Sequence, residues 1–429
     1  MRIKLVALNC RYTHSCAALF YVRQELAARL GGAGIVLRQY ALNDPYHPTL
    51  LRIAEGQPEA IFFSVYLWND EYVRRLTHDL RKLLPGVPVV LGGPQITYGG
   101  HGEDFPENCT LVRGEVEGLP PAFYHDLQAG CLGREYAADP AAEFRSPYRD
   151  EDFAGELRSR QVYYESTRGC PFACGYCLSA ATRGVRTRGL PEVKEELAAI
   201  LRHQPKTLRF VDRTFNAHPG RTLDLWRFLA AQGGETACHF EIAPELFTEE
   251  MLDFLATLPP DRFQFEVGLQ STHPATLAAV SRSMDLARVR ANLARLAALD
   301  TIHLHLDLIL GLPLETPETF RRSVNEALAL APHHIQMGLL KLLPGTPLTA
   351  AAGEYGLVAR ERPPYEVLAT GTMTAEALAR LYWIGECIES FWNSRFFRAV
   401  LAYLRRTEPD PFGFFEELTG VCRRHGFFE

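Results

Sequence analysis

The sequence lacks long hydrophobic runs and has few cysteines, and each shortage excludes a class of protein. No apolar run approaches the roughly 20 residues that a membrane-spanning helix needs. The opening MRIKLVALNC is too short, and too soon interrupted by Arg11, to be a signal peptide. Ten cysteines among 429 residues are far fewer than a disulfide scaffold carries. We therefore expect a cytoplasmic protein with no membrane partner.

A basic surface is also missing. The formal net charge is -6, and only five of the 45 basic residues are lysine, so we expect no nucleic-acid partner. No internal repeat or low-complexity tract is visible. With 429 residues, 47% of them hydrophobic, the chain exceeds one ordinary core and should form two or three domains.

Three of the cysteines lie together in the stretch 161–180, as Cys170, Cys174 and Cys177. Three thiolates can hold three irons of a [4Fe–4S] cube and leave the fourth iron open to a small molecule. A structural zinc site usually needs four ligands, commonly as two pairs, and no second pair has a suitable spacing. An odd trio also fits a disulfide role poorly. We therefore predict a [4Fe–4S] cluster on these three residues.

The first 135 residues alternate between short apolar runs and helical periods. Continuous apolar strands with crossover helices indicate a doubly wound parallel sheet of the Rossmann-like class, and ligands bind such sheets at the carboxyl ends of the strands. The strand-end loops, at 9–15, 66–69, 92–98 and 113–117, are rich in small, aromatic and polar residues. We expect a ligand face there.

A charged, proline-punctuated linker is expected at 136–158, followed by a second strand–helix series at 159–348. Six strand-like runs in this series predict a partial (β/α)6 barrel: 162–166, 207–212, 238–243, 263–270, 302–310 and 335–343. From 349 to 429 the pattern becomes helical and aromatic-rich, which predicts a small helical domain.

Polar residues alternate with apolar ones along the predicted barrel strands. This period of two places His239 with Glu241 on one face, and likewise His303, His305 and Asp307. We expect a polar lumen that hydrogen-bonds a cofactor or substrate. The last three could also form a two-His-one-carboxylate iron site, although alternate residues on one strand span roughly 7 Å.

The cysteine spacing, with Tyr176 before the last cysteine, resembles the radical S-adenosylmethionine (SAM) superfamily. The runs VDRTFN (211–216), GLQS (268–271), LILGLP (308–313) and LLPGT (342–346) add to this resemblance. It implies that SAM chelates the open iron and is cleaved to a 5′-deoxyadenosyl radical. It also implies a set of SAM-side residues. Asp212 would lie near the amino group, Gln270 and Ser271 near the ribose, Arg282 on the carboxylate and Ile309 beside adenine, with Tyr176, Glu241 and Asp307 completing the set.

The whole chain resembles a bacterial family that combines a cobalamin-binding domain, a radical SAM barrel and a DUF4080 extension. The likeness lies in phrases such as ALNCRYTHS, ESTRGCPFACGYCLS, HLHLDLILGLP and RPPYEVL. It implies cobalamin at the strand ends of the first domain. The implied contacts are Tyr12, His14, Ser64, Trp68, Gly93, Pro94 and Glu115. The D-x-H-x-x-G signature is absent, which puts a lower axial histidine in doubt, and a Rossmann-like domain without corrinoid stays open.

The resulting hypothesis is a cobalamin-dependent radical SAM enzyme that methylates an unactivated carbon or phosphorus centre. One alternative is radical cyclisation or rearrangement, with cobalamin non-methylating or absent. Another is a non-catalytic iron–sulfur protein. We expect a small-molecule or peptide substrate and a reductant such as flavodoxin or ferredoxin.

Overall fold

The computed structural model describes residues 1–99, 102–181 and 184–428. Its contacts divide the chain into two compact units. The first comprises Met1–Tyr164 and Glu196–Arg209, and the second comprises Glu165–Glu195 and Phe210–Glu429.

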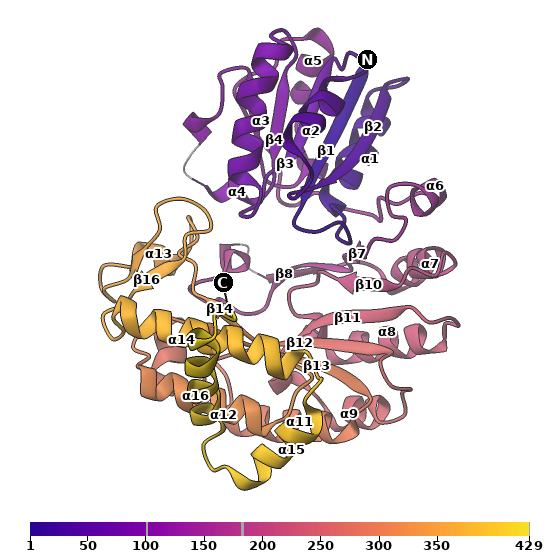
Figure 1. Ribbon diagram of the computed structural model, residues 1–429. Helices are drawn as coiled ribbons and strands as arrows, with labels where there is room; N and C mark the ends of the chain where they lie inside the picture. Colours follow the sequence, from indigo (N-terminus) through magenta and orange to yellow (C-terminus); the bar gives the residue numbers. More distant parts are fainter. Residues whose placement is uncertain (100–101, 182–183, 429) are drawn as a thin grey trace. The chain divides into compact units, whose positions relative to one another are not determined.

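The first unit contains a six-stranded sheet in the order β2-β1-β3-β4-β5-β6, with neighbouring strands parallel. All five residues of β3 are buried, as expected for a parallel sheet covered on both faces. Helices flank this sheet (Figure 1). Its strands are β1 (Arg2–Asn9), β2 (Gly34–Ala41), β3 (Ala60–Ser64), β4 (Val89–Gly92), β5 (Cys109–Arg113) and β6 (Glu135–Ala137). Its helices are α1 (Ala17–Arg29), α2 (Tyr46–Ala54), α3 (Asp70–Leu83), α4 (Pro94–Tyr98), α5 (Pro121–Ala129) and α6 (Asp150–Ala154), with short turns η1 (Gly102–Asp104) and η2 (Val116–Gly118).

Helix α3 illustrates why these segments fold as they do. Its first turn carries Asp70 and Glu71 and its last turn Arg81 and Lys82, which complements the helix dipole. The α6 segment, within the predicted linker, is joined to α1 by a buried ion pair of Arg23 with Asp152 at 2.5 Å.

A second six-stranded sheet has the order β14-β13-β12-β11-β10-β7, and β11 to β14 pair in parallel. In β12 and β13, buried apolar residues alternate strictly with half-buried ones. The polar face predicted for the barrel lumen therefore exists. The strands are β7 (Val162–Tyr164), β10 (Thr207–Phe210), β11 (Ala237–Ile242), β12 (Phe263–Gln270), β13 (Ile302–Leu310) and β14 (His334–Leu339). The accompanying elements are α7 (Leu190–Leu201), η4 (Phe215–Ala217), α8 (Pro219–Ala231), η5 (Pro244–Leu246), α9 (Glu249–Leu255), α10 (Pro274–Ala279), α11 (Leu286–Leu299), α12 (Pro317–Ala329) and α13 (Pro347–Ala350).

The apolar face of this sheet is packed with aromatic rings. Trp226 of α8 is fully buried and lies 5.3 Å from the ring centroid of Phe265 and 6.1 Å from that of Phe240. Burial of such rings is a large source of stability, and here it fixes the strands whose other face carries polar groups.

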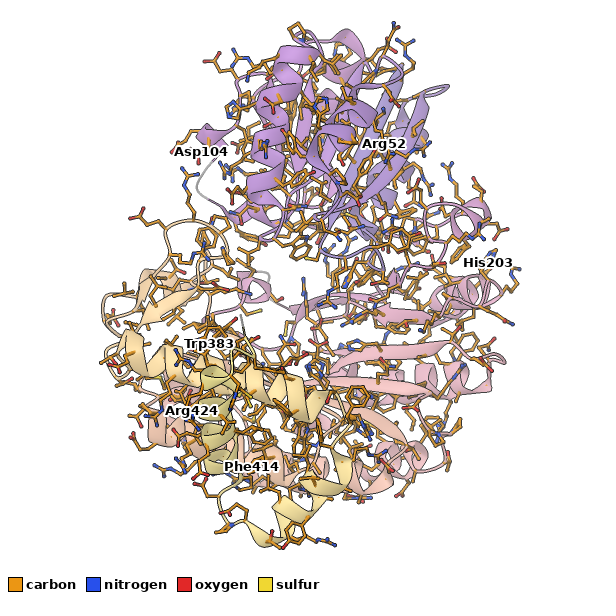
Figure 2. The ribbon with its side chains drawn as sticks, viewed as in Figure 1. Arg52, Asp104, His203, Trp383, Phe414 and Arg424 are labelled. Carbon is orange, nitrogen blue, oxygen red and sulfur yellow. The ribbon has the colours of Figure 1, made fainter. Side chains whose placement is uncertain are left out.

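The last segment is mainly helical, as predicted, with α14 (Ala375–Ile388), α15 (Arg398–Thr407), α16 (Pro411–Arg424) and a small hairpin of β15 (Val358–Ala359) and β16 (Val367–Ala369). A π-helical turn, η6 (Glu389–Asn393), follows α14. Figure 2 labels Trp383 on α14 and Arg424 on α16. The predicted fold class, with a Rossmann-like sheet, a partial barrel and a helical C-terminal region, is confirmed.

Among the helices in the described ranges, none combines the length and apolarity required to cross a bilayer.

Candidate active site

The three motif cysteines lie on and just after one short hairpin. Strand β8 (Thr167–Cys170) pairs antiparallel with β9 (Gly184–Thr187), and Cys170 ends β8. Cys174 is buried, and the amide of Cys177 donates a 3.1 Å hydrogen bond to the Cys174 carbonyl. Each of the three is a free thiol. A short turn η3 (Leu178–Ala181) follows.

Arg282 lies directly beside this loop. Its guanidinium donates a hydrogen bond to the sulfur of Cys174 at 3.5 Å and another to the Gly268 carbonyl. Burial alone would lower the pKa of Arg282, but neighbouring Tyr176 and Cys174 outweigh it and raise that pKa. A permanent positive charge therefore stands next to one of the three motif cysteines.

Gln270 joins the same group at the end of β12. A bulge between Gly268 and Gln270 interrupts the pairing with β13, and Gln270 has a φ of 65°. Its amide nitrogen folds back to within 2.2 Å of where a Cβ on residue 268 would lie. Gln270 Oε1 and Arg282 Nε are buried without a hydrogen-bond partner among the described residues. Such groups are costly to bury alone, and a polar ligand with amino and hydroxyl groups would satisfy the amide oxygen.

Asp212 occupies a different kind of position. Its carboxylate accepts hydrogen bonds from the Ser166 amide at 3.0 Å, the Ser166 hydroxyl at 2.6 Å and the Thr167 hydroxyl at 2.7 Å. Burial raises its pKa. Asp212 thus anchors the start of the cysteine hairpin. The nearby Thr214, which sequence reasoning missed, places its hydroxyl 3.4 Å from the sulfur of Cys170.

Ser271 is fully buried, and its hydroxyl donates a 2.6 Å hydrogen bond to Glu315. Glu315, also missed from the sequence, is itself fully buried. Burial raises its pKa to about 8, so the neutral carboxyl is the form present at pH 7. Its backbone carbonyl accepts a hydrogen bond from Thr372 at 2.6 Å. Glu315 therefore connects the Gln270–Ser271 turn to the C-terminal segment.

Glu315→Gln should change how stability depends on pH. A carboxyl whose folded pKa is raised binds more protons folded than unfolded, so the wild type loses stability as pH rises from about 4.5 to about 8. The uncharged amide has no such loss. We expect the free energy of unfolding of the variant, relative to that of the wild type, to increase by ~1–3 kcal/mol from pH 5 to pH 8, as measured by urea unfolding. If the stability difference between variant and wild type is the same at both pH values, the raised pKa of Glu315 is contradicted.

The lumen face brings the predicted histidines and acids together in pairs. His239 Nε2 lies 3.2 Å from Glu266 Oε2, and His305 Nε2 lies 3.1 Å from Asp307 Oδ1. Burial raises the pKa of Asp307. Glu241 pairs in register with Glu266, and Ile309 is half-buried near the end of β13.

These lumen residues do not form a mononuclear metal site. Among the described residues, no three His, Cys, Asp or Glu side chains lie close enough to hold one ion. The iron site considered for His303, His305 and Asp307 therefore gains no support. A [4Fe–4S] cube is a different case, because each cysteine binds a different iron.

The predicted cobalamin contacts gather at the carboxyl ends of adjacent strands β1, β3, β4 and β5. Gly93 has a φ of 101°, and a Cβ there would lie 2.7 Å from the Val65 carbonyl and 3.1 Å from the Ser64 hydroxyl. Ser64 Oγ is buried without a well-formed hydrogen bond to any described residue, and Pro94 begins α4. Trp68 is 49% exposed and stacks on Tyr66 at 4.5 Å. Glycine at 93 thus lets the loops after β3 and β4 approach closely, beside the exposed aromatic ring of Trp68.

Three other predicted contacts lie at the same strand ends. Tyr12 is 60% exposed, and the guanidinium carbon of Arg160 lies 4.3 Å from its ring centre. His14 Nδ1 lies 2.8 Å from the Tyr163 hydroxyl, and burial, with Arg209 and Arg11, lowers its pKa. Glu115 is half-buried and follows β5. A hydrogen-bonded Nδ1 leaves only Nε2 of His14 for a metal.

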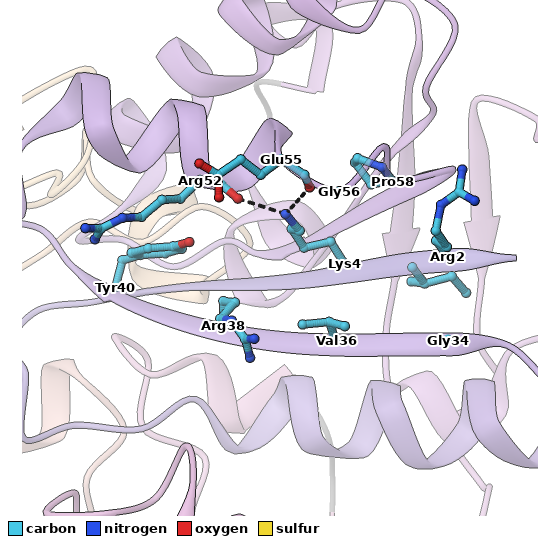
Figure 3. Close-up of a pocket in the computed structure, with 11 residues that line it drawn as sticks. Arg2, Lys4, Gly34, Val36, Arg38, Tyr40, Arg52, Glu55, Gly56 and Pro58 are labelled. Carbon is cyan, nitrogen blue, oxygen red and sulfur yellow. Dashed lines mark hydrogen bonds between the residues drawn. The ribbon is translucent and has the colours of Figure 1, made fainter.

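A separate hollow of about 710 Å³ lies on the same unit (Figure 3). It is lined by Arg2 and Lys4 at the start of β1 and by Gly34 and Val36 at the start of β2. Lys4 donates hydrogen bonds of 2.8 and 2.7 Å to the carbonyls of Arg52 and Glu55. This hollow is at the amino ends of the strands, opposite the edge where the predicted ligand contacts lie.

Comparison with known proteins assigns two parts of the chain. Residues 164–327 match the radical SAM superfamily, and residues 353–429 match a protein family of unknown function, DUF4080. The radical SAM match includes the cysteine loop and strands β10 to β13. Together with the relatives below, this confirms the family predicted from the sequence.

Two curated relatives align along most of this chain. The cobalamin-dependent radical SAM methyltransferase TokK of Streptomyces tokunonensis is 25% identical over 82% of the chain and 60% of its own length. The 2-(S-pantetheinyl)-carbapenam-3-carboxylate methyltransferase of Streptantibioticus cattleyicolor is 26% identical over 86% of the chain and 64% of its own length. The chain thus spans about three fifths of these relatives.

Solved structures share the fold. The radical SAM methyltransferase TsrM from Kitasatospora setae, with tryptophan and a SAM analogue, superimposes with a TM-score of 0.65 at 18% identity. The match covers 85% of this chain and 79% of TsrM. The cobalamin-dependent SAM radical enzyme OxsB with aqua-cobalamin gives 0.62 at 14% identity, covering 76% of this chain and 51% of OxsB.

Proposed function

We propose that this protein is a cobalamin-dependent radical SAM enzyme that methylates an unactivated carbon or phosphorus centre of a small molecule or peptide. The observation that carries the proposal is the group of Cys174, Arg282 and Gln270, in which a cysteine with two motif partners stands beside a buried guanidinium and an unsatisfied amide. When bound, the cluster supplies the electron that cleaves SAM to methionine and a 5′-deoxyadenosyl radical, and cobalamin supplies the methyl group.

The chain's own residues would bind and orient SAM at the cluster. Cys170, Cys174 and Cys177 would hold three irons. Arg282 offers a planar, permanently charged fork that suits the SAM carboxylate. Gln270 Oε1, without a partner in the described residues, would accept a hydrogen bond from the ribose.

Other predicted residues would act more indirectly. Asp212 and Ser271 are both committed to buried hydrogen bonds, with Ser166 and Glu315 respectively. They would hold the cysteine hairpin and the Gln270 turn in position. The pairs His239–Glu266 and His305–Asp307 would line the substrate side of the lumen.

Cobalamin would lie at the strand ends around Ser64, Gly93 and Trp68. The small residues there allow close backbone approach, and the stacked Tyr66 and Trp68 rings offer an apolar wall. The relative TokK, named as a cobalamin-dependent radical SAM methyltransferase, supports this half of the proposal.

The direct test is reductive SAM cleavage by the anaerobically reconstituted, full-length protein. With dithionite and SAM it should release 5′-deoxyadenosine and methionine, at least slowly, without added substrate. If protein with a full cluster releases no 5′-deoxyadenosine, the proposed enzymatic function is contradicted and a non-catalytic iron–sulfur protein is favoured. Cleavage without corrinoid would favour cyclisation or rearrangement.

Arg282→Ala should weaken SAM binding. Loss of one charge-assisted hydrogen-bonded pair costs ~1.5–3 kcal/mol, so we expect the Kd for SAM to rise about 10- to 100-fold. Arg282→Lys keeps the positive charge but lacks the planar guanidinium fork, so its Kd for SAM should lie between those of the wild type and Arg282→Ala. The matched control is Arg290→Ala, since Arg290 pairs with Glu326 at 2.8 Å at the surface. Equilibrium dialysis with cluster content held equal is the measurement, and an unchanged Kd in Arg282→Ala would remove Arg282 from the SAM site.

A further inference from the structure

A pocket of about 260 Å³ lies beside helix α15 in the DUF4080 part of the chain. Three of its lining residues are arginines: Arg395, just before the helix, and Arg398 and Arg405 on it. The opposite wall comes from the loops that precede β13 and β14. The pocket thus adjoins the amino ends of these strands, whereas ligands of such sheets bind at the carboxyl ends.

Two of the three guanidinium groups have no protein partner. Within the described ranges, neither Arg395 nor Arg398 forms a side-chain hydrogen bond or ion pair. Arg405 donates a 2.8 Å hydrogen bond to the Ala329 carbonyl. One lining residue is acidic, Asp300, and its carboxylate is 74% exposed and lies 3.6 Å from His333 Nε2.

The arginines lower the pKa values of two neighbouring histidines. Burial lowers the pKa of His333, and Arg395 and Arg398 contribute to that lowering. His303, whose ring centre lies 4.9 Å from that of His333, has its pKa lowered to about 4 by burial, by His333 and by Arg395. Asp300 and Asp261 act in the opposite sense at His333, so nearby carboxylates offset only part of this positive charge.

The net positive charge and the size of the pocket together indicate which kind of ligand it would bind. Three guanidinium groups against one carboxylate leave a formal charge of +2 in a chain whose net charge is -6. Like charges that line one pocket repel each other, and a bound dianion offsets this repulsion. Three alanines also line the pocket, together with the larger apolar residues Pro332, Trp392 and Leu401, and the volume of about 260 Å³ leaves room for a tetrahedral group.

We propose that this pocket binds a phosphate group, held by the guanidinium forks of Arg395, Arg398 and Arg405. Planar guanidinium groups bind phosphate oxygens bidentately. The site gives the DUF4080 segment a binding role that does not depend on the radical reaction proposed above.

The test is calorimetric titration of the full-length protein with inorganic phosphate at constant ionic strength, with chloride as the blank. Arg398 is exposed and unpartnered, so Arg398→Ala should fold normally and weaken phosphate binding at least tenfold. Arg395→Ala should do the same, and Arg398→Lys should retain part of the affinity. The matched control is Arg406→Ala, an exposed neighbour on α15 that is not among the residues lining the pocket, and it should stay within twofold of wild type.

Three results would overturn the proposal: no heat from phosphate beyond the chloride blank, an equal loss in Arg406→Ala, or acetate binding as tightly as phosphate. SAM cleavage without substrate, measured with and without saturating phosphate, separates two sources of the group. A change that Arg398→Ala abolishes indicates a free phosphate effector. An unchanged rate, with phosphate bound, indicates a phosphoryl group carried by a molecule other than the radical substrate.

Discussion

Replacing Cys174 with alanine should abolish both the cluster and SAM cleavage. The wild-type chain, reconstituted without oxygen, should carry about four irons and four sulfides. With one thiolate gone, a second iron would have no protein ligand, and the cube would not be retained. Cys170→Ala and Cys177→Ala should behave in the same way. Iron and sulfide analysis, the visible absorbance of the cluster and the yield of 5′-deoxyadenosine are the measurements, and all should fall to background.

The chain provides matched controls for this experiment. Cys10 and Cys131 are exposed free thiols outside the loop, so Cys10→Ala and Cys131→Ala should leave the cluster and cleavage unchanged. Buried cysteines such as Cys238 are poorer controls, because truncation there also creates a cavity. If an outside cysteine proves essential as a fourth ligand, no iron is open and the proposed SAM chemistry is excluded.

The barrel strands could be predicted from the sequence because their pattern is local. The predicted runs 263–270 and 302–310 are the bounds of β12 and β13, since strict alternation of polar and apolar residues encodes one buried face. Strand β2 was not predicted. It is an edge strand whose pattern is broken by Arg38 and by Gln39, which is buried and receives a 2.8 Å hydrogen bond from the Cys16 amide.

The helical C-terminal segment was predicted in kind but not in detail. The apolar and aromatic residues at 376–406 recur at helical spacing, and the structure interrupts this stretch with the π-turn η6 and non-helical residues before α15. Asn393 of η6 explains the interruption. Its side chain accepts a hydrogen bond from the Ile335 amide and donates one to the Ile335 carbonyl, both at 2.9 Å. It thus satisfies the free edge of β14, a tertiary contact with no local signal.

The candidate site likewise contains some residues that the sequence predicts and others that it does not. The cysteines and Arg282 could be predicted because their spacing matches a known superfamily, and the structure brings Arg282 to Cys174. Glu315 and Thr214 could not, since their contacts with Ser271 and Cys170 each join residues 44 positions apart. The one available signal for Glu315 was its place two residues after the GLP of LILGLP and directly before the capping residue Thr316.

Gly93→Leu should abolish corrinoid binding while leaving SAM cleavage in place. Residue 93 has a φ of 101°, and its Cβ would lie 2.7 Å from the Val65 carbonyl. A leucine there must therefore displace the loops that end β3 and β4, which form the predicted cobalamin surface. Wild-type protein purified from cobalamin-fed cells should show corrin absorbance, and the variant should show none. The residues proposed for SAM cleavage belong to the second unit. If the variant still forms 5′-deoxyadenosine, the damage is confined to the first unit.

A second variant separates loss of contact from loss of local structure. Trp68 is 49% exposed, so Trp68→Ala removes an apolar wall without opening a core cavity and should reduce corrinoid content several-fold. The matched control is Leu83→Ala, because Leu83 is 48% exposed at the end of α3, on the same unit but away from the strand ends. Methyl transfer requires the methyl donor within about 3–3.5 Å of the substrate atom, so a chain that never retains cobalamin cannot use it. Wild-type protein that cleaves SAM yet repeatedly fails to take up cobalamin would exclude the methyltransferase and favour corrinoid-free cyclisation or rearrangement.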